Sequence, residues 1–135
     1  MDQIVFIDAN IFLEIILKDK KNEECKKFLK RIIDGEILGI TSDFIVFTCL
    51  LQIQHKTKDL NKMKDFIIFI NSIFGLKIMK SSLSNLIKTI NFMQEYKLDF
   101  DDALVISCMR SNNINNLISL DKDFDKVRFI KREEP

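Results

Sequence analysis

Short apolar runs alternate with helical patterns along this chain, and that alternation constrains the fold more than any other feature. The runs are rich in Ile, Val, Leu and Phe, as expected for short strands buried on both faces. They cover residues 4–7, 37–41, 76–79, 116–120 and 127–130. Strands joined by helices form right-handed crossovers, so we predict an α/β fold, a three-layer α/β/α domain with a five-stranded, mainly parallel sheet.

Between these runs, apolar residues recur at the 3.6-residue spacing of amphipathic helices. We predict helices over residues 9–18, 22–34, 43–56, 59–74, 83–93 and 102–111. Asn22 and Ser42 are the expected N-caps of two of them, and Gly35 and Gly75 are the expected stops. The order of the strands in the sheet does not follow from this pattern.

Length and charge narrow the class of protein. The chain has 135 residues, the usual size of one domain, and we expect residues 1–135 to form a single domain. Its formal net charge is +1, so any attraction to nucleic acid must come from local basic patches. Only 3 Gly and 1 Pro are present, which favours a fold rich in regular elements.

The cysteines and the apolar runs indicate a cytoplasmic protein that makes no membrane contact. Cys25, Cys49 and Cys108 are scattered and odd in number, which is typical of buried free thiols in a reducing compartment. The single histidine, His55, leaves no ligand set for zinc. The longest apolar runs, about five residues, are far shorter than a bilayer span, and the first residues lack the pattern of a secretory signal.

Aspartates gather where strands are expected to end and helices to begin. They are Asp8, Asp99, Asp101, Asp102, Asp121 and Asp123. Taken singly, Asp8, Asp99 and Asp121 are well explained as helix N-caps. Taken together, the acids fall on the edge formed by the carboxyl ends of parallel strands, where open α/β sheets bind ligands.

Such crowding of carboxylates calls for a cation. Carboxylates packed at one edge would raise one another's pKa values unless a positive ion screened them. Because nitrogen and sulfur ligands are missing from these segments, a hard divalent cation with oxygen ligands, Mg²⁺ or Mn²⁺, fits best. We therefore expect a metal centre and name its candidate ligands as Asp8, Asp102, Asp121 and Asp123.

Four segments, in this order, resemble the motifs of the PIN-domain family. They are VFIDANIF (5–12), TS (41–42), LDFDDALVISC (98–108) and ISLDKDF (118–124). The resemblance covers essentially the whole chain, and is strongest to the compact prokaryotic type that includes the VapC-type toxin ribonucleases. It implies a doubly wound sheet, an acidic Mg²⁺ or Mn²⁺ site, endonucleolytic cleavage of RNA, homodimers and often a small antitoxin partner.

The resemblance also assigns roles to residues. Asp8 and Asp102 match the two most diagnostic metal ligands of the family, and Asp121 and Asp123 share its last acidic position. Supporting roles fall to Asn10, which would orient Asp8, and to Asp99, Thr48 and Ser119. Ser119 would either support the site from behind or face a phosphate.

One departure from the family pattern concerns the middle helix. PIN nucleases usually carry a glutamate about six residues after the TS start, and that position is Thr48 here. Residues 44–58 contain no acid at all, so the departure does not depend on the alignment. Thr48 and Gln52 would offer neutral oxygens one turn apart. We expect weaker metal binding, above all for a second ion, and reduced turnover.

Basic side chains near the acids are candidates for gripping RNA. Lys122 and Arg110 are the main ones, with Lys126 and Arg128 close by in the sequence. Tyr96, just before the LDFDD segment, is the aromatic residue most suited to stacking on a base.

Two other functional classes compete with a metal-dependent endoribonuclease. A PIN fold without the middle glutamate could serve as an RNA-binding or protein-binding module. A phosphotransfer or phosphatase domain is the minor alternative, because Asp8 ends a strand, but the acids and the lysine which those families need are not in place. A homodimer is expected from residues 44–53, which are apolar on nearly every side of the predicted helix.

Overall fold

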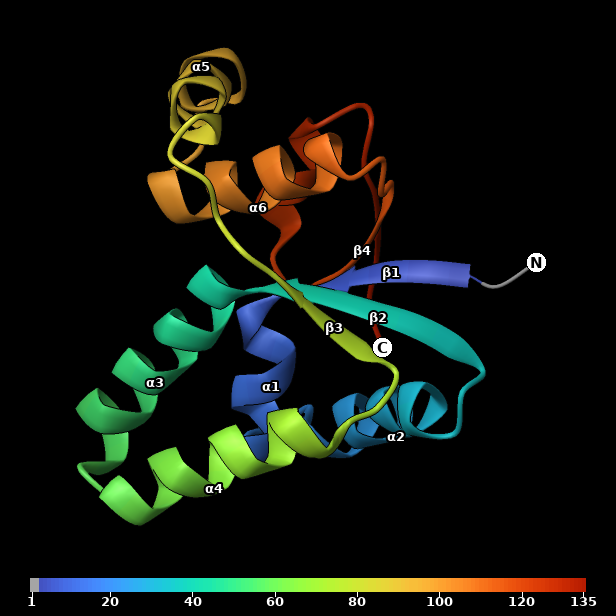
Figure 1. The fold of residues 1–135 in the computed structure, drawn as a ribbon, viewed down its shortest axis with the longest axis vertical. Coiled ribbons are helices and arrows are strands. Elements are labelled where there is room, and N and C mark those ends of the chain that lie inside the picture. Colours follow the sequence, from blue (N-terminus) through green and yellow to red (C-terminus); the bar gives the residue numbers. More distant parts are fainter. Residues whose placement is uncertain (1–2) are drawn as a thin grey trace.

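The computed structural model describes residues 3–135 and confirms the three-layer α/β/α architecture (Figure 1). Its five strands are β1 (Gln3–Ile7), β2 (Ile37–Ser42), β3 (Leu76–Met79), β4 (Asn116–Ile118) and β5 (Lys131–Glu133). They form one sheet in the order β3-β2-β1-β4-β5, and every neighbouring pair is parallel. The chain therefore builds the sheet outward on one side of β1 and then crosses to the other side.

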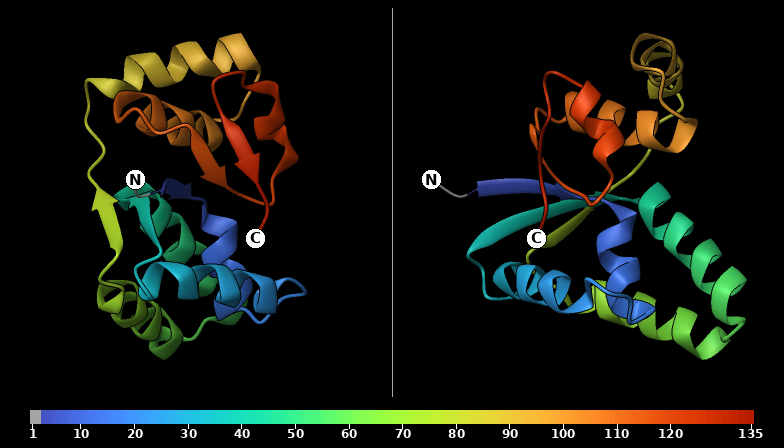
Figure 2. Two further views of the ribbon diagram at one scale, coloured as in Figure 1. Left: turned by 90° about the vertical axis from the view of Figure 1, so that its right-hand side faces the viewer. Right: turned by 180° about the vertical axis from the view of Figure 1, so that it is seen from behind.

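The helices cover both faces of the sheet. On one face lie α1 (Ala9–Ile16), α2 (Asn22–Ile33), α3 (Asp43–Thr57) and α4 (Leu60–Ser72), and on the other lie α5 (Asn85–Tyr96) and α6 (Phe100–Ser111) (Figures 1 and 2). A short 3₁₀ helix, η1 (Lys122–Lys126), connects β4 to β5. Within residues 3–135, no helix is both long enough and apolar enough to cross a membrane.

Local sequence explains where several helices begin and end. The Ser42 hydroxyl accepts a hydrogen bond from the Ile45 amide at 3.2 Å, which is the expected N-cap of α3. Gly35, with φ of +80°, follows α2 in the left-handed conformation that glycine adopts without strain. Gly75 has a different role from the expected stop. A Cβ there would lie 2.7 Å from the Ile32 carbonyl oxygen, so glycine is required for close packing.

The fifth strand was predicted in the wrong place. Residues 127–130 form a turn, in which the Val127 amide donates to the Phe124 carbonyl and the Ile130 amide donates to the Val127 carbonyl. The strand is the polar segment Lys131–Glu133, which pairs with β4. An edge strand needs only main-chain hydrogen bonds on one side, so its residues carry no apolar signal, whereas Val127 is apolar because it packs in the core.

Smaller corrections concern element boundaries. Strand β4 ends at Ile118 rather than at residue 120, and α6 begins at Phe100 rather than at Asp102. The N-cap of α2 is Lys21, one residue before the expected Asn22. These shifts leave the aspartates at the strand ends and helix starts where they were expected.

Candidate metal centre

The strand order brings the acidic segments to one end of the sheet. Strand β1 lies between β2 and β4, and the chain reverses its direction of winding between β1 and β4. In open α/β sheets such a switch point leaves a crevice outside the carboxyl ends of the strands. Asp8 follows β1 directly, Asp121 follows β4, and α6 begins on the same side with Asp102 in its first turn (Figure 1).

Three carboxylates meet in this crevice. One oxygen each from Asp102, Asp121 and Asp123 lies within 4.8 Å of the others. Asp102 and Asp121 are half-buried and Asp123 is exposed, so the group is open to solvent on one side. Carboxylate oxygens at this spacing suit a hard divalent cation such as Mg²⁺ or Mn²⁺, with water completing the coordination.

Asp8 lies behind this group rather than within it. Its side chain is 7% exposed, and one carboxylate oxygen caps α1 by accepting from the Ala9 amide at 2.8 Å. The other oxygen accepts from the Ser119 hydroxyl at 2.7 Å and from the Asn10 amide at 3.2 Å. Burial raises the pKa of Asp8, the contacts with Ser119 and Ala9 oppose the rise, and the charge of Asp121 adds to it. Capping and proximity to the acids thus coexist in one residue.

Ser119 and Asn10 hold Asp8 and Asp121 in a fixed relation. The Ser119 hydroxyl donates to Asp8 and accepts from the Asp121 amide at 3.0 Å. Asn10 donates to Ser119 at 3.3 Å as well, and its side-chain oxygen accepts from the Leu120 amide at 3.2 Å. Ser119 is 0% exposed, and its hydroxyl faces the protein, where it contacts Asp8 and the Asp121 amide.

The electrostatics of Asp102 show how crowded the site is. The pKa of Asp102 rises to about 7, first through burial and then through the charges of Asp101, Asp121, Asp8 and Asp123. A bound cation would relieve the burial cost and the repulsion together, because it favours the ionised form of every carboxylate. The donor set and its charge therefore fit a divalent metal.

The other acids of the cluster have structural contacts. Asp121 caps η1, since its carboxylate accepts from the Asp123 amide at 2.9 Å. The Asp101 carboxylate accepts from the Asp102 amide at 3.0 Å. Asp99 occupies the N-cap position of α6 but is exposed, and its side chain makes no capping hydrogen bond. Asp99 is therefore placed as expected without the contact that the capping-box pattern predicts.

Helix α3 brings no free carboxylate to the crevice. Thr48 and Gln52 are half-buried on this helix, one turn apart. The acid of α3 is Asp43 in its first turn, and its carboxylate accepts hydrogen bonds from the hydroxyl and amide of Ser81, at 2.6 and 3.1 Å. Asp43 is thus tied to the segment between β3 and α5, and does not replace the missing glutamate.

The basic candidates separate into two groups. Lys122 is exposed and stands between Asp121 and Asp123 in η1. Arg110 lies in the last turn of α6, eight residues and about 12 Å along the helix axis from Asp102. Its guanidinium carbon sits 4.7 Å from the centre of the Phe129 ring. Lys122 is therefore next to two of the acids in the chain, whereas Arg110 lies away from them.

Tyr96 and Arg132 have contacts that the sequence did not predict. Tyr96 packs against Phe92 and Phe129, with ring centres 6.0 and 6.3 Å away, so it belongs to an aromatic cluster. Arg132, which the sequence patterns did not single out, donates to the Ser119 carbonyl oxygen at 3.0 Å. No local sequence signal marks Arg132, because it stands in a polar edge strand and its contact with Ser119 joins residues 13 positions apart.

Comparison with known proteins supports the resemblance drawn from the motifs. A family model described as PIN domain matches residues 5–130. Among solved structures, the sarcin–ricin-loop-cleaving toxin VapC20 of Mycobacterium tuberculosis matches with a TM-score of 0.76 and 15% identity, over 93% of this chain and 96% of that chain. VapBC2 of Rickettsia felis, bound to a DNA fragment from its promoter, matches with a TM-score of 0.77 and 15% identity, over 98% of each chain.

A toxin–antitoxin complex from Klebsiella pneumoniae matches with a TM-score of 0.72 and 16% identity, over 94% of this chain and 95% of that chain. At these identities the structural matches establish the fold alone. No curated protein matches the sequence significantly.

The strand order bears on the phosphotransfer alternative, because it differs from the 2-1-3-4-5 order of receiver domains. The receiver-domain form of the phosphotransfer alternative therefore lacks support from the fold.

Proposed function

The chain belongs to the PIN-domain family, and from that premise we propose that it is a divalent-metal-dependent endoribonuclease. The observation that carries the proposal is the meeting of Asp102, Asp121 and Asp123 within 4.8 Å, in front of the buried Asp8. Oxygen ligands from separate segments, with a raised carboxyl pKa among them, are typical of a cation site rather than of simple helix capping.

Each residue of the site has a distinct task in this proposal. Asp102, Asp121 and Asp123 would hold Mg²⁺ or Mn²⁺, and a bound ion supplies a Lewis acid and a water of lowered pKa. Asp8, whose carboxylate is held by Ser119 and Asn10, would add from behind these three the further ligand that the family resemblance assigns to it. Lys122 offsets the repulsion between the acids and an incoming phosphate. Because water attacks, the products would carry 5′-phosphate and 3′-hydroxyl ends.

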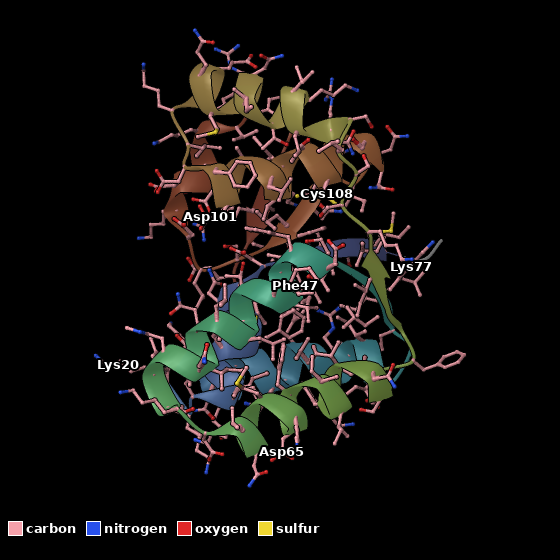
Figure 3. All side chains as sticks on the ribbon, turned by 60° about the vertical axis from the view of Figure 1, so that its left-hand side comes forward. Lys20, Phe47, Asp65, Lys77, Asp101 and Cys108 are labelled. Atoms are coloured by element: carbon pink, nitrogen blue, oxygen red, sulfur yellow. The ribbon has the colours of Figure 1, made fainter. Side chains whose placement is uncertain are left out.

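The test is cleavage of a structured RNA by the purified protein with and without Mn²⁺. Asp102→Asn is the sharpest variant, since Asp8 also caps α1 and its replacement by alanine would disturb the fold. The matched control is Asp65→Asn, an exposed acid on α4 at the far end of the protein from Asp101 (Figure 3). We expect Mn²⁺-dependent cleavage by wild type and control only. Products with 2′,3′-cyclic phosphate ends would contradict the mechanism.

A binding module without turnover is the second candidate, and the lack of a free acid on α3 favours it. Asp43 is held by Ser81, so the crevice has one carboxylate fewer than the family pattern. The same assay separates the two functions. A binding module would retain RNA on a filter equally well with wild type and Asp102→Asn, and no product would appear at any Mn²⁺ concentration.

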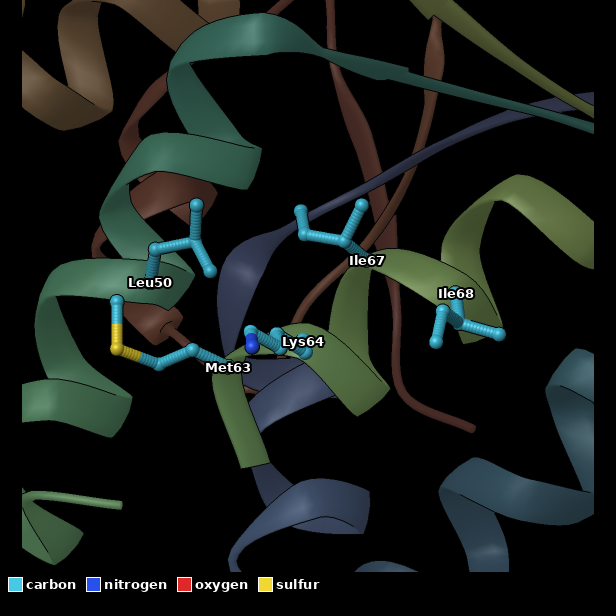
Figure 4. A pocket seen from close by; sticks show the side chains of 5 residues that line it. All are labelled: Leu50, Met63, Lys64, Ile67 and Ile68. Carbon is cyan, nitrogen blue, oxygen red and sulfur yellow. The ribbon is translucent and has the colours of Figure 1, made fainter. Parts of the chain in front are cut away.

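We also infer a role as the toxin of a toxin–antitoxin pair, supported by the similar folds of the VapC and VapBC proteins. An apolar groove of about 390 Å³ lies over α3 and α4 (Figure 4). It is lined by Leu50, Met63, Lys64, Ile67 and Ile68. An apolar segment of a small antitoxin would fit there. Expression of the wild type in bacteria should arrest growth, expression of Asp102→Asn should not, and Ile68→Glu should weaken capture of a short protein encoded by a neighbouring gene.

The proposed compartment is the cytoplasm. Cys25, Cys49 and Cys108 are all free thiols, and the first two are buried. Free thiols are stable in a reducing compartment, where an RNA substrate is also present. Fractionation of cells that produce the protein at low level would test this placement.

A further inference from the structure

We propose that Arg132 is a positioning residue which holds η1 and the end of β4 so that the acidic side chains face one another. The inference rests on the proposed metal centre and adds a residue to it. Arg132 stands in the edge strand β5, yet its side chain is only 11% exposed. An arginine this enclosed in an edge strand must have its donors satisfied by the protein.

The guanidinium bridges three parts of the chain. Its Nε and Nη2 donate to the two carboxylate oxygens of Asp125, at 2.8 and 3.3 Å. Its Nη1 donates to the Glu134 carboxylate at 2.8 Å and to the Ser119 carbonyl oxygen at 3.0 Å. This planar fork of donors is specific to arginine, because a lysine ammonium cannot span the same acceptors.

Through Ser119, Arg132 is linked to Asp8, the buried carboxylate behind the acidic cluster. The Ser119 amide donates to the Glu133 carbonyl at 3.1 Å, and the Ser119 carbonyl accepts from Arg132. Strand β5 therefore holds both main-chain polar groups of Ser119. The fixed main chain sets the direction of the hydroxyl, which donates to Asp8 and accepts from the Asp121 amide.

Through Asp125, Arg132 is linked to η1, the 3₁₀ helix that carries Asp123 and is capped by Asp121. Asp125 belongs to the same 3₁₀ helix as Asp123 and follows the capping Asp121 by four residues. Two hydrogen bonds, at 2.8 and 3.3 Å, hold the Asp125 carboxylate on the Arg132 guanidinium. A short 3₁₀ helix has few internal hydrogen bonds, and an anchor at its end limits the motion of the two acids at its start.

The sign of the effect on metal affinity distinguishes positioning from simple electrostatics. If Arg132 acted only through its positive charge, removing the charge would strengthen cation binding, because less repulsion would remain. If Arg132 positions Asp121 and Asp123, removing it must weaken cation binding. Supporting contacts of metal ligands typically contribute about 10-fold to 100-fold in affinity.

The experiment is titration calorimetry with Mn²⁺ on the full chain, at a temperature where every variant is folded. The variants are Arg132→Met and Arg132→Lys, and the control is Lys131→Met, the neighbouring side chain of β5, which is 72% exposed. We expect the Kd to rise about 10-fold or more for both Arg132 variants and to stay unchanged for the control. Unchanged or tighter binding by Arg132→Met, or wild-type affinity in Arg132→Lys, would overturn the inference.

Amide hydrogen exchange without metal separates failure of this inference from failure of the nuclease proposal. Arg132→Met should speed exchange of the Asp121 and Asp123 amides about 10-fold or more, while the amides of β1 keep their protection. Wild-type exchange at these two amides would refute the positioning role, whatever the metal result. If exchange rises as expected but wild type takes up no Mn²⁺, the proposed function fails and the positioning role stands.

Discussion

Asp102 combines a benefit for cation binding with a cost for the fold. Its half-buried carboxylate has a pKa of about 7, raised by burial and by four neighbouring carboxylates. The unfolded chain has no such crowding, so Asp102 ionises there near its ordinary pKa of 3.8. A bound cation would stabilise the ionised Asp102 carboxylate and offset this cost. Without a cation, the negative charge of Asp102 destabilises the folded state.

The first prediction is that Asp102→Asn stabilises the metal-free protein. Because the pKa is raised in the folded state, wild-type stability should fall as the pH rises from about 4 to about 7, and then stay level. After allowance for solvent screening, we expect the variant to be about 1 kcal/mol more stable at pH 8, equivalent to about 3 °C in Tm. Thermal unfolding measures the change.

The control for this prediction is the same measurement at pH 4, where the wild-type carboxyl is protonated and the difference in Tm should vanish. Adding Mn²⁺ at pH 8 should raise the Tm of the wild type and leave that of Asp102→Asn unchanged. A variant less stable than wild type at pH 8 without metal would show that Asp102 is not under electrostatic strain.

The second prediction concerns the buried hydroxyl of Ser119. Ser119→Ala removes the 2.7 Å donor to Asp8 and leaves a buried carboxylate with fewer partners. We expect a loss of about 1–3 kcal/mol in the free energy of unfolding at pH 7, measured with urea. Ser72→Ala, which removes an exposed hydroxyl from α4, should change stability by less than about 0.5 kcal/mol. Equal effects of the two substitutions would contradict the role of Ser119.

Part of the site could be predicted from the sequence because its acids follow strands and start helices. That placement alone brings Asp102, Asp121 and Asp123 together once the strands are parallel. The direction of each side chain is set by contacts between distant segments. Hence neither the recessed place of Asp8 nor the bridge made by Arg132 could be derived from local patterns.

Among the helices, α3 differs most from the family pattern. Its N-cap and length are as predicted, but it presents Thr48 where a glutamate is expected. The third prediction is that Thr48→Glu strengthens Mn²⁺ binding by about 10-fold, because one more carboxylate ligand adds charge at the crevice. Calorimetry measures the Mn²⁺ affinity. The control is Thr48→Gln, because glutamine has the shape of glutamate but no charge. Equal affinities for Glu and Gln variants would mean that Thr48 does not face the metal.

Element prediction succeeded where burial and periodicity agree. Strands β1 and β2 and helix α3 were predicted to within a residue or two, since most of their apolar residues face the core and Ser42 caps α3. The edge strand β3 also has the predicted bounds, although Ile78 is 41% exposed. Strand β5 was missed because an edge strand can be polar, and its apolar neighbour Val127 is 1% exposed at the end of η1. Apolar residues in the sequence mark positions that are buried, and a buried segment is not always paired with a neighbouring strand.

The arrangement of the strands and helices in space could not be predicted to the same depth. Strand order depends on which crossovers pack together, a property of contacts between distant segments. The observed order places the switch point between β1 and β4, and this order, rather than any motif, creates the crevice. Apolar side chains are exposed on helices from both layers, notably Leu51 on α3 and Ile87 on α5.

The fourth prediction is that the protein forms a dimer through α3. Ile45, Val46, Cys49 and Ile53 of this helix face the core. On its outer side lies Phe47, which is 56% exposed (Figure 3). Leu51, one turn further along the same face, is 64% exposed. Burial of such side chains between two copies would contribute about 1.5–3 kcal/mol each. We therefore expect a dimer by sedimentation at micromolar concentration.

The variant that tests this surface is the pair Phe47→Glu and Leu51→Glu, which places charges on the exposed face without touching the core side of α3. It should sediment as a folded monomer, with the circular dichroism of wild type. Gln54→Glu adds a charge to the same helix at an exposed polar position and should remain dimeric. A wild-type monomer at micromolar concentration would refute the dimer. A dimer that survives the double substitution would move the interface to another surface, where the exposed Ile87 of α5 is the next position to change.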